Sequence, residues 1–356
     1  MNILLIQLKR IGDLILSAPA IAAIRAQIPD AKITLVLSRE TAALLPALPA
    51  VDRALIIRRS IGDIRTLSSI AFTRFDYSVD FTRNSRSALL SFLSHAGKRI
   101  VSFRVKKRAP LRGRAYNEFV HHRMRDMHTI DYNLSLLEPL GVSPETAPPL
   151  SLTLPEEAVR EAKNILGHSH IRAPFALVHP GSARVEKFWE PKRWAEVIRH
   201  LVNQQIDVVI TGGTSRIEQS HLGEIMGELP PPTADSQTGG VVDLSGKMDL
   251  LTLAAIIARA RIVLTVDSAP VHLAAALKIP QVALYGPTNP FHWRPRDSVA
   301  RILQGDSDAP LQEFVPKQSR LPMKLISTEA VINAMNALLS DSEHLDSAPS
   351  LTLPRL

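Results

Sequence analysis

The sequence of 356 residues contains no cysteine, and only 5% of its residues are aromatic. The missing cysteine excludes disulfide bonds, thiolate metal ligands and a cysteine nucleophile, and it is compatible with a reducing compartment. Aromatic residues are not interleaved with the basic ones, and no nucleic-acid-binding motif is present. We therefore predict no nucleic-acid partner.

Long apolar runs are also missing, since no stretch of about 18 uncharged apolar residues occurs and no segment is expected to span a bilayer. The opening stretch resembles a signal peptide, but Lys9, Arg10 and Asp13 interrupt it and no basic residue precedes it. We predict instead a strand, a loop and a helix of the mature protein. The motif G-x-G-x-x-G does not follow this strand, which argues against a dinucleotide-dependent oxidoreductase.

Apolar stretches alternate with helical ones in both halves of the chain. This alternation predicts two doubly wound α/β domains with parallel sheets, which place their loops around one cleft. Four prolines in residues 141–155 mark the boundary. The predicted units are an N-terminal domain (1–150), a C-terminal domain (151–327), a last helix (328–340) and a flexible tail (341–356). Strands are expected at 3–8, 33–38, 54–57, 77–81, 99–103, 175–179, 207–211, 241–244, 262–266 and 281–285, and helices at 14–28, 85–95, 192–204, 217–226, 250–258, 269–277 and 328–339.

Positive charge is concentrated in the first half. Residues 1–150 carry 22 Lys/Arg against 12 Asp/Glu, whereas the remaining residues carry 20 against 22. Residues 98–125 alone hold ten cations opposed only by Glu118. Each of these cations taken singly is more simply a solvated surface residue. As a group they indicate an anionic partner.

The segment 262–288 predicts a buried strand, a polar hinge, a small-residue helix and a second buried strand. Ser268 is a good N-cap and Pro270 suits the first helical turn, so the helix should begin there. A helix N-terminus at the carboxyl end of a parallel strand favours a phosphate, and His272 would add a donor one turn later. Alternatively, Asp267 simply caps the helix and His272 is a packed polar residue.

Two further loops are expected at the same cleft. In the first, Gly12 permits a tight turn, and Asp13 either caps the following helix or accepts a proton. The second carries Ser182, Arg184 and Lys187, and Trp189 with Pro191 should restrict its freedom. Gly212 and Gly213 follow another strand. The pairs His121-His122 and His168-x-His170 are interpreted as surface histidines without partners, and no metal site is predicted.

Four stretches together carry a resemblance: ILLIQLKRIGDLILSAPAIAAIR, HPGSARVEKFWEPKRW, LSGKMDLLTLAAIIARA and VDSAPVHLAAALKIPQVALYGPT. From Met1 to about Leu339 the chain resembles glycosyltransferase family nine, the heptosyltransferases of lipopolysaccharide core assembly. The stretch DFTRNSRSALLSFLSHAGKRIVSFR further resembles the heptosyltransferase III branch. The resemblance implies a GT-B fold with two Rossmann-like domains, acceptor bound by the first and ADP-heptose by the second.

The resemblance also implies residue roles. Asp13 matches the general base, Lys187 the lysine that contacts the donor's phosphate and sugar, and Glu218 the acid that contacts the ribose. Ser268 and Ala269 stand where the family often has Thr-Gly, whose N–H groups hold the diphosphate. The expected donor-binding set is Ser182, Arg184, Lys187, Gly212, Gly213, Glu218, Lys247, Met248, Asp267, Ser268, Ala269 and His272. The expected acceptor-binding set is Arg10, Arg58, Arg59, Arg104, Lys106, Lys107 and Arg112.

The expected reaction is a metal-independent, inverting transfer without a cofactor, in which Asp13 takes a proton from the acceptor hydroxyl. Lys187 and the helix N-terminus would stabilise the departing diphosphate. The basic stretch fits a phosphorylated, carboxylate-rich glycolipid and the cytoplasmic face of the inner membrane, where the enzyme would be peripheral. The alternatives are another GT-B sugar-nucleotide transferase or epimerase, and a donor-binding module without catalysis.

Overall fold

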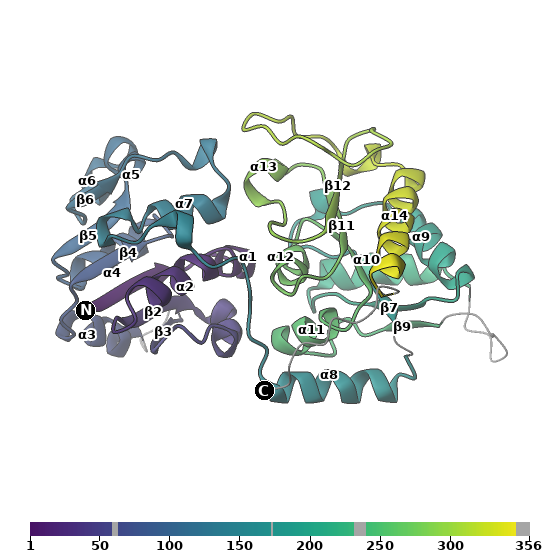
Figure 1. Ribbon diagram of the computed structural model, residues 1–356, viewed down its shortest axis with the longest axis horizontal. Helices are drawn as coiled ribbons and strands as arrows, with labels where there is room; N and C mark the ends of the chain where they lie inside the picture. Colours follow the sequence, from purple (N-terminus) through teal and green to yellow (C-terminus); the bar gives the residue numbers. More distant parts are fainter. Residues whose placement is uncertain (59–62, 172–173, 231–239, 347–356) are drawn as a thin grey trace.

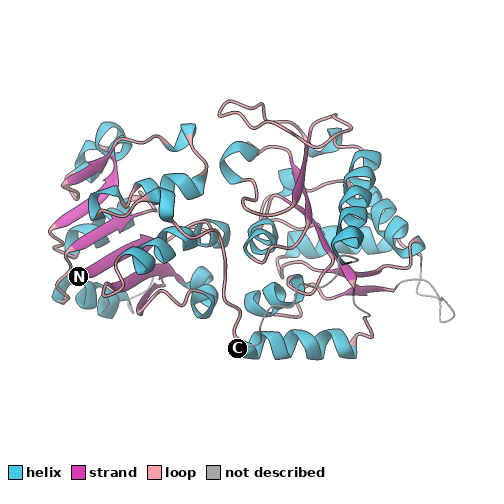
Figure 2. Ribbon diagram, viewed as in Figure 1, coloured by secondary structure: helices cyan, strands magenta, loops and turns pink. Residues whose placement is uncertain are grey.

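The computed structural model describes residues 1–58, 63–171, 174–230 and 240–346. Two α/β domains lie side by side, and in each one helices cover a parallel sheet (Figures 1 and 2). The inner strands of both sheets, such as those at Asn2–Gln7, Lys32–Ser38, Phe175–His179 and Ile262–Val266, are apolar and mostly buried, as expected for parallel sheets covered on both faces. The fold class predicted from the sequence is confirmed.

The N-terminal sheet has six parallel strands in the order β3-β2-β1-β4-β5-β6. The direction of winding reverses between β1 and β4, which pair in parallel from Ile3 opposite Tyr77 to Ile6 opposite Asp80. In doubly wound sheets a ligand binds beyond the carboxyl ends of the strands at this switch point. The strands are β1 (Asn2–Gln7), β2 (Lys32–Ser38), β3 (Arg53–Ile57), β4 (Tyr77–Asp80), β5 (Lys98–Ser102) and β6 (Glu118–Val120).

The C-terminal sheet repeats this winding, with the order β12-β11-β10-β7-β8-β9. Its switch point lies between β7 and β10, which pair from Ala176 opposite Ile262 to His179 opposite Thr265. The strands are β7 (Phe175–His179), β8 (Asp207–Ile210), β9 (Val241–Asp243), β10 (Ile262–Val266), β11 (Gln281–Tyr285) and β12 (Ala300–Gln304).

The ten strands expected from the sequence are all present, but the expectation omitted β6 and β12. Both are edge strands. β6 has only three residues and β12 is partly exposed at its first two positions, so neither shows a continuous apolar run. A short edge strand gains its order from the neighbouring strand rather than from a pattern of its own.

The N-terminal domain contains one correction to the predicted helices. Residues 14–28 form two helices, because α1 ends at Ile15 and α2 restarts at Ala18 with Pro19 in its first turn. The helices are α1 (Ile11–Ile15), α2 (Ala18–Gln27), η1 (Arg39–Ala47), α3 (Asp63–Phe72), α4 (Ser85–Leu93), α5 (Phe103–Arg108), α6 (Pro110–Gly113), η2 (Met124–Asp126), α7 (Thr129–Ser135), η3 (Glu138–Leu140) and η4 (Pro144–Thr146).

The helices predicted for the C-terminal domain are all present, but the helix at Glu156–His168 is missing from the prediction, and the last helix continues past Ser340 to Asp346. The expectation of a tail beyond residue 340 is therefore wrong for its first residues, and residues 347–356 lie outside the described part. The helices are α8 (Glu156–His168), η5 (Val185–Lys187), α9 (Pro191–Asn203), α10 (Arg216–Gly227), α11 (Leu250–Ile257), α12 (Ala269–Ala276), α13 (Pro290–Trp293), η6 (Met323–Leu325) and α14 (Thr328–Asp346).

The two domains meet through apolar and polar contacts. Residues 141–155 run from one to the other (Figure 1), and the position of the boundary stays a prediction. One buried cluster includes both Leu44 of η1 and Ala255 of α11, so apolar packing continues across the junction. The ring nitrogens of His128 and His292 reach the backbone oxygens of Arg294 and Met127, at 2.9 and 3.0 Å, respectively. Asp131 and Arg296 form an ion pair at 2.5 Å.

Candidate active site

A cavity of about 810 Å³ opens where the loops of the two domains face each other. The N-terminal domain contributes the loop after β1 and Glu40 of η1, and the C-terminal domain contributes the loops after β7, β8 and β10. The cavity therefore lies at the switch points of both sheets. Among the predicted site residues, its wall contains Arg10, Asp13, Ser182, Arg184, Lys187, Gly212, Gly213, Glu218, Met248, Asp267, Ser268, Ala269 and His272.

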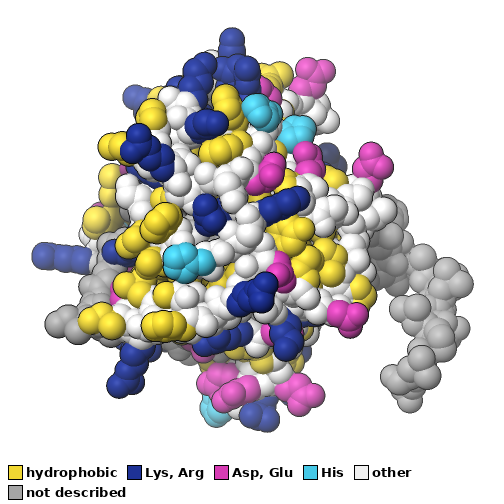
Figure 3. Space-filling model, turned by 90° about the vertical axis from the view of Figure 1, so that its left-hand side faces the viewer, with side chains coloured by type: hydrophobic (Ala, Val, Ile, Leu, Met, Phe, Trp, Pro, Cys, Tyr) yellow, Lys and Arg dark blue, Asp and Glu magenta, His cyan; other side chains and the backbone are white. Residues whose placement is uncertain are grey.

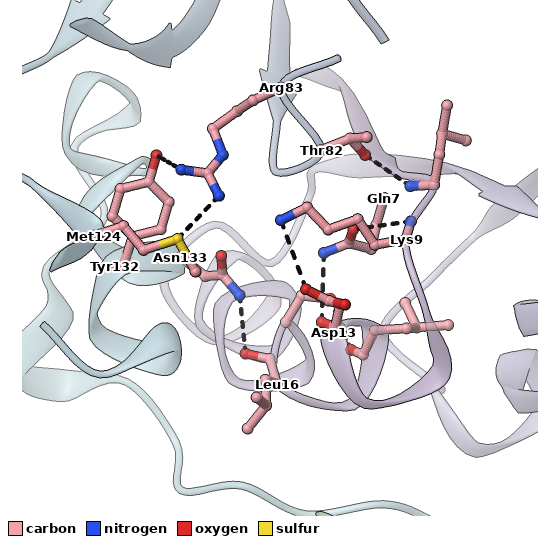
Figure 4. Close-up of polar contacts among 12 residues, drawn as sticks. Gln7, Lys9, Asp13, Leu16, Thr82, Arg83, Met124, Tyr132 and Asn133 are labelled. Atoms are coloured by element: carbon pink, nitrogen blue, oxygen red, sulfur yellow. Dashed lines mark hydrogen bonds and ion pairs between the residues drawn. The ribbon is translucent and has the colours of Figure 1, made fainter. Parts of the chain in front are cut away.

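Asp13 lies in the first turn of α1, whose N-cap is Arg10 rather than Asp13. Its carboxylate is 14% exposed and faces the ammonium group of Lys9 at 3.6 Å, as the close-up in Figure 4 shows. Gln7 donates to the backbone oxygen of Asp13 at 3.4 Å. The carboxylate is thus positioned by α1 and reaches the cavity, and among the described residues its Oδ2 has no partner, which leaves this oxygen available to a hydroxyl group.

Lys187 and Asp267 form an ion pair on the opposite wall. The Lys187 Nζ lies 2.5 Å from Asp267 Oδ2 and 2.9 Å from its backbone oxygen, and the two side chains are only 12% and 8% exposed. The predicted anchoring of the Lys187 loop is confirmed by Trp189, which is fully buried and donates to the Ile326 backbone oxygen at 3.0 Å. An ammonium group held this firmly suits a phosphate oxygen.

The helix predicted after Asp267 is present as α12, which begins at Ala269. Ser268 occupies the N-cap position, but its hydroxyl donates to the Val266 backbone oxygen at 3.2 Å and does not cap the helix. The first N–H groups of α12 therefore stay available for an anion. They lie on the same wall as Lys187.

His272 connects the two walls. It is buried, and its ring lies so close to Gly12 that a methyl group on that residue would come within 2.7 Å of Cδ2. Burial lowers the pKa of His272, against the opposing effect of the Asp267 and Asp13 carboxylates, so the neutral imidazole is favoured. Its Nδ1 has no hydrogen-bond partner within the described residues.

Glu218 also lines the cavity, and Ser215 Oγ donates to its carboxylate at 3.0 Å. A methyl group on Gly181 would come within 2.6 Å of this carboxylate, and one on Gly213 would also collide with it. The two glycines therefore leave the space that Glu218 fills. An apolar wall of Leu244, Met248, Leu250 and Leu253 lies nearby and suits a flat, uncharged ring.

Several predicted residues do not reach the cavity. Lys247 turns away from the wall and donates to the Asp243 backbone oxygen at 2.6 Å. Arg58 follows β3, whereas Arg104, Lys106, Lys107 and Arg112 belong to α5 and α6 and lie outside the cavity wall. Arg59 lies outside the described residues. Figure 3 shows blue Lys and Arg side chains gathered at the upper edge of the N-terminal domain, the side on which α5 and α6 lie in Figure 1.

The histidine pairs lie on the surface as predicted, but the expectation that they lack partners is wrong for three of the four residues. His122 Nε2 lies 2.8 Å from Glu138, His121 stacks on Phe103 and His168 contacts the Asn164 backbone oxygen at 2.8 Å. In the part of the chain that the structure describes, no group of three or more His, Asp or Glu residues is arranged to hold a metal ion. Nor does any helix there have the length and apolar character needed to cross a membrane.

Sequence reasoning also missed part of the wall. His179 ends β7 and lines the cavity, with Nδ1 2.9 Å from Thr211 Oγ1, and burial lowers its pKa to about 4. Glu40, Thr288 and Trp293 line the cavity as well. A signal for Thr288 existed, since it follows a predicted strand. Glu40 and Trp293 reach the site only through the way the domains pack.

The arrangement can perform a displacement between two bound groups. A carboxylate stands on one wall, and an ammonium group with a helix N-terminus stands on the other. A base next to an incoming hydroxyl and cations next to a departing phosphate are the requirements of glycosyl transfer from a nucleotide-activated sugar.

Comparisons with known proteins agree with this chemistry. Residues 65–322 match the sequence pattern of glycosyltransferase family 9 (heptosyltransferase). Lipopolysaccharide heptosyltransferase 3 of Escherichia coli is 24% identical over 340 residues, which cover 93% of this chain and 97% of that protein.

Two solved structures show the same fold. The Escherichia coli ADP-heptose LPS heptosyltransferase II has a TM-score of 0.77 at 22% identity, with 96% of this chain and 100% of that one covered. Escherichia coli heptosyltransferase WaaC with ADP-2-deoxy-2-fluoro heptose has a TM-score of 0.69 at 19% identity, with 95% and 99% covered. The predicted GT-B arrangement is thereby confirmed.

Proposed function

The chain belongs to glycosyltransferase family 9, the heptosyltransferases, and we propose that it transfers heptose from ADP-heptose to the inner core of lipopolysaccharide. The observation that carries this proposal is that Asp13 and the pair Lys187–Asp267 lie on opposite walls of one cavity. The family match does not favour a GT-B epimerase or a binding module without catalysis. The similarity to lipopolysaccharide heptosyltransferase 3 of Escherichia coli supports transfer to a side-branch position of the core.

The donor is proposed to lie along the C-terminal wall. Its diphosphate would contact Lys187 and the N–H groups at the start of α12, since both offer positive charge to the same space. Its ribose hydroxyls would donate to Glu218, and its adenine would lie against Met248 and the neighbouring leucines. Arg184 and Ser182 line the same wall.

The reaction is proposed to be a single displacement. Asp13 takes the proton of the acceptor hydroxyl while the oxygen of that hydroxyl forms a bond to the anomeric carbon. The bond from that carbon to the phosphate oxygen breaks, and ADP leaves on the opposite face, so the configuration inverts. Negative charge accumulates on the diphosphate in the transition state, where Lys187 and α12 stabilise it more than in the ground state.

The acceptor is proposed to be an anionic glycolipid at the cytoplasmic face of the inner membrane. The exposed cations of α5 support this location, because they lie outside the cavity and face solvent on the acceptor-side domain. Each basic residue near an anionic leaflet adds about 1 kcal/mol to membrane attraction. Arg104, Lys106 and Lys107 would therefore help the enzyme stay at the surface where its substrate is found.

The test is a transfer assay with ADP-heptose and lipopolysaccharide extracted from cells that lack the outermost inner-core heptose. We expect ADP release that requires acceptor, a product heavier by one heptose and an inverted anomeric centre by NMR. Thermal shift with ADP-, UDP- and GDP-sugars should show stabilisation by the ADP-sugar alone at matched concentration. ADP release without acceptor, or stabilisation by a UDP-sugar instead, would contradict the proposal.

A further inference from the structure

Lys9 and Arg83 lie at the switch point of the N-terminal sheet, next to Asp13. Lys9 is in the loop after β1 and Arg83 in the loop after β4, and these strands are neighbours. Thr82 ties the loops together, since its Oγ1 accepts from the Leu8 N–H at 2.7 Å and donates to the Ile6 oxygen at 3.2 Å. Figure 4 shows both cationic side chains directed toward the same space beside Asp13.

The loop that carries Arg83 is held in place by hydrogen bonds to the buried side chain of Asp80. Asp80 is fully buried and accepts from the backbone N–H groups of Thr82 and Arg83 at 2.7 and 2.9 Å and from Tyr116 Oη at 2.5 Å. Arg83 itself has a left-handed backbone with φ of 67°. Such a conformation in a residue other than glycine costs free energy and persists only when its surroundings enforce it.

The guanidinium group of Arg83 is positioned entirely by neutral partners. It donates to Tyr132 Oη at 3.2 Å and contacts Met124 Sδ at 3.0 Å, and its Cζ lies 4.8 Å from the centre of the Tyr132 ring. Its Nε is buried without a hydrogen-bond partner, and the described residues place no carboxylate within ion-pair distance of this side chain. A fixed guanidinium group without a counter-charge is prepared for an anion.

Lys9 adds a second positive charge to the same place. Burial, followed by the nearby charge of Arg83, lowers the pKa of Lys9, while Asp13 and Asp80 act in the opposite direction. The Lys9 side chain is still 26% exposed, so a ligand can reach it. Two cations therefore face the same space, and among the described residues only the carboxylate of Asp13, the expected base, lies within ion-pair distance of Lys9. An incoming anion would relieve the repulsion between the cations.

We propose that Lys9 and Arg83 form an anion-binding subsite that holds an acidic group of the acceptor, a carboxylate or a phosphate, beside Asp13. This inference rests on the proposed function, and it identifies the part of the acceptor that is recognised next to the reacting hydroxyl. Since Lys9 Nζ is 3.6 Å from Asp13 Oδ1, an acid bound there places a hydroxyl on the same or the next sugar within reach of the base. The C-terminal sheet holds Lys187 at its equivalent switch point.

The experiment compares Arg83→Gln and Lys9→Met with wild type in steady-state transfer from ADP-heptose. The acceptor is de-O-acylated inner-core lipooligosaccharide in three forms: as extracted, treated with phosphatase, and carboxyl-reduced. Arg53→Gln is the matched control, because Arg53 is exposed at the opposite, amino end of β3 and donates to Ser69 there. Thermal melts of all variants verify that they are folded.

We expect Arg83→Gln to raise the acceptor KM at least tenfold, which corresponds to about 1.4 kcal/mol of binding free energy, and to leave the donor KM within twofold. Arg83→Lys should recover part of the loss, and Arg53→Gln should match wild type. If wild type and Arg83→Gln have the same acceptor KM on the phosphatase-treated acceptor, the bound group is a phosphate. If they have the same acceptor KM on the carboxyl-reduced acceptor, the bound group is a carboxylate. An unchanged acceptor KM, or an equal rise in both KM values, would overturn the subsite.

A second measurement separates this inference from the proposed function. If wild type transfers no heptose, the proposed function fails, and equilibrium binding of the same lipooligosaccharide to ADP-saturated protein still tests the subsite. Calorimetry should then show at least tenfold weaker binding to Arg83→Gln than to wild type and Arg53→Gln. Equal affinities for all three proteins would reject the subsite regardless of transfer.

Discussion

Gly12 of one domain lies directly against the imidazole ring of His272 of the other. A methyl group added to Gly12 would lie only 2.7 Å from His272 Cδ2, which is too close for a real contact. This contact joins α1 to α12. It stands between Asp13 and the first turn of α12, where the donor's diphosphate is proposed to bind. The absence of a side chain at Gly12 therefore sets the distance between the proposed base and the proposed leaving group.

Gly12→Ala should lower kcat by about tenfold or more, because the added methyl group forces α1 and α12 apart and misplaces Asp13 relative to the donor. Initial rates at saturating ADP-heptose and acceptor measure the effect. Gly223→Ala is the control, since a methyl group there meets no atom within 4 Å. A Gly12→Ala enzyme with the wild-type kcat would show that the domains work at a wider separation.

Asp13→Asn should lower kcat by about two to four orders of magnitude while the donor KM stays nearly constant, because the amide keeps the size of the side chain but cannot accept the proton. Asp30→Asn, at an exposed position of the same domain, should behave as wild type. Steady-state kinetics over pH 6 to 9 provides the comparison. Retention of more than a tenth of wild-type turnover would remove Asp13 from the role of base.

Lys187→Ala should raise the donor KM and lower kcat together, since the ammonium group is proposed to contact the diphosphate both before and during its departure. The variant also leaves the Asp267 carboxylate, only 8% exposed, without its cation, which adds an unfavourable charge to the site. Calorimetry with ADP and transfer kinetics measure the two effects. Lys192→Ala, exposed at the start of α9, is the control that should change neither.

Excess EDTA should leave the transfer rate unchanged, because in the proposed mechanism Lys187 and the N–H groups of α12 supply the positive charge that the departing ADP requires. Rates measured before and after dialysis against chelator make the comparison. A loss of activity that magnesium or manganese restores would mean that a divalent cation binds with the donor.

Acid should destabilise the fold partly through His128, whose burial lowers its pKa to about 3. An unfolded histidine has a pKa of about 6.5, so below that pH the unfolded state binds the proton first. The buried, neutral His128 therefore makes its full contribution to the free energy of unfolding above pH 6.5. This contribution is lost at about 1.4 kcal/mol per pH unit as the pH falls from 6.5 toward 3.

His128→Gln keeps a donor for the Arg294 backbone oxygen but removes the titrating group. The free energy of unfolding in urea should then fall less steeply between pH 6.5 and 4.5 than in wild type. His168→Gln, on the exposed end of α8, should leave the slope as it is. Equal slopes for wild type and His128→Gln would contradict the assignment.

The sequence was most informative where one segment determines its own structure. The buried strands were predictable from their apolar runs, and Asp13, Lys187 and Asp267 were predictable as cleft residues because each follows such a strand. Edge strands β6 and β12 were not, because neighbouring strands order them. The break between α1 and α2 could have been inferred from Pro19, because proline suits the first turn of a new helix and not the interior of a longer one.

Contacts between distant segments could not be predicted. Arg83 was hidden among many basic residues, and its place beside Lys9 depends on the pairing of β1 with β4. The Glu138 partner of His122 and the contact of Gly12 with His272 likewise arise only when the chain has folded. The charge counts give greatest weight to the cations of α5, which lie away from the cavity.

The proposed donor site and the proposed acceptor site are built by different domains, and this separation affects how such enzymes can change their substrate preference. All parts of the proposed donor site come from residues 179–293, and the proposed base and acidic-group subsite come from residues 9–83. Recombination within residues 141–155 would therefore exchange acceptor preference without disturbing donor recognition. Such an exchange requires that the contacts between the two domains stay compatible. These contacts join Gly12 to His272, Met127 to His292 and Asp131 to Arg296.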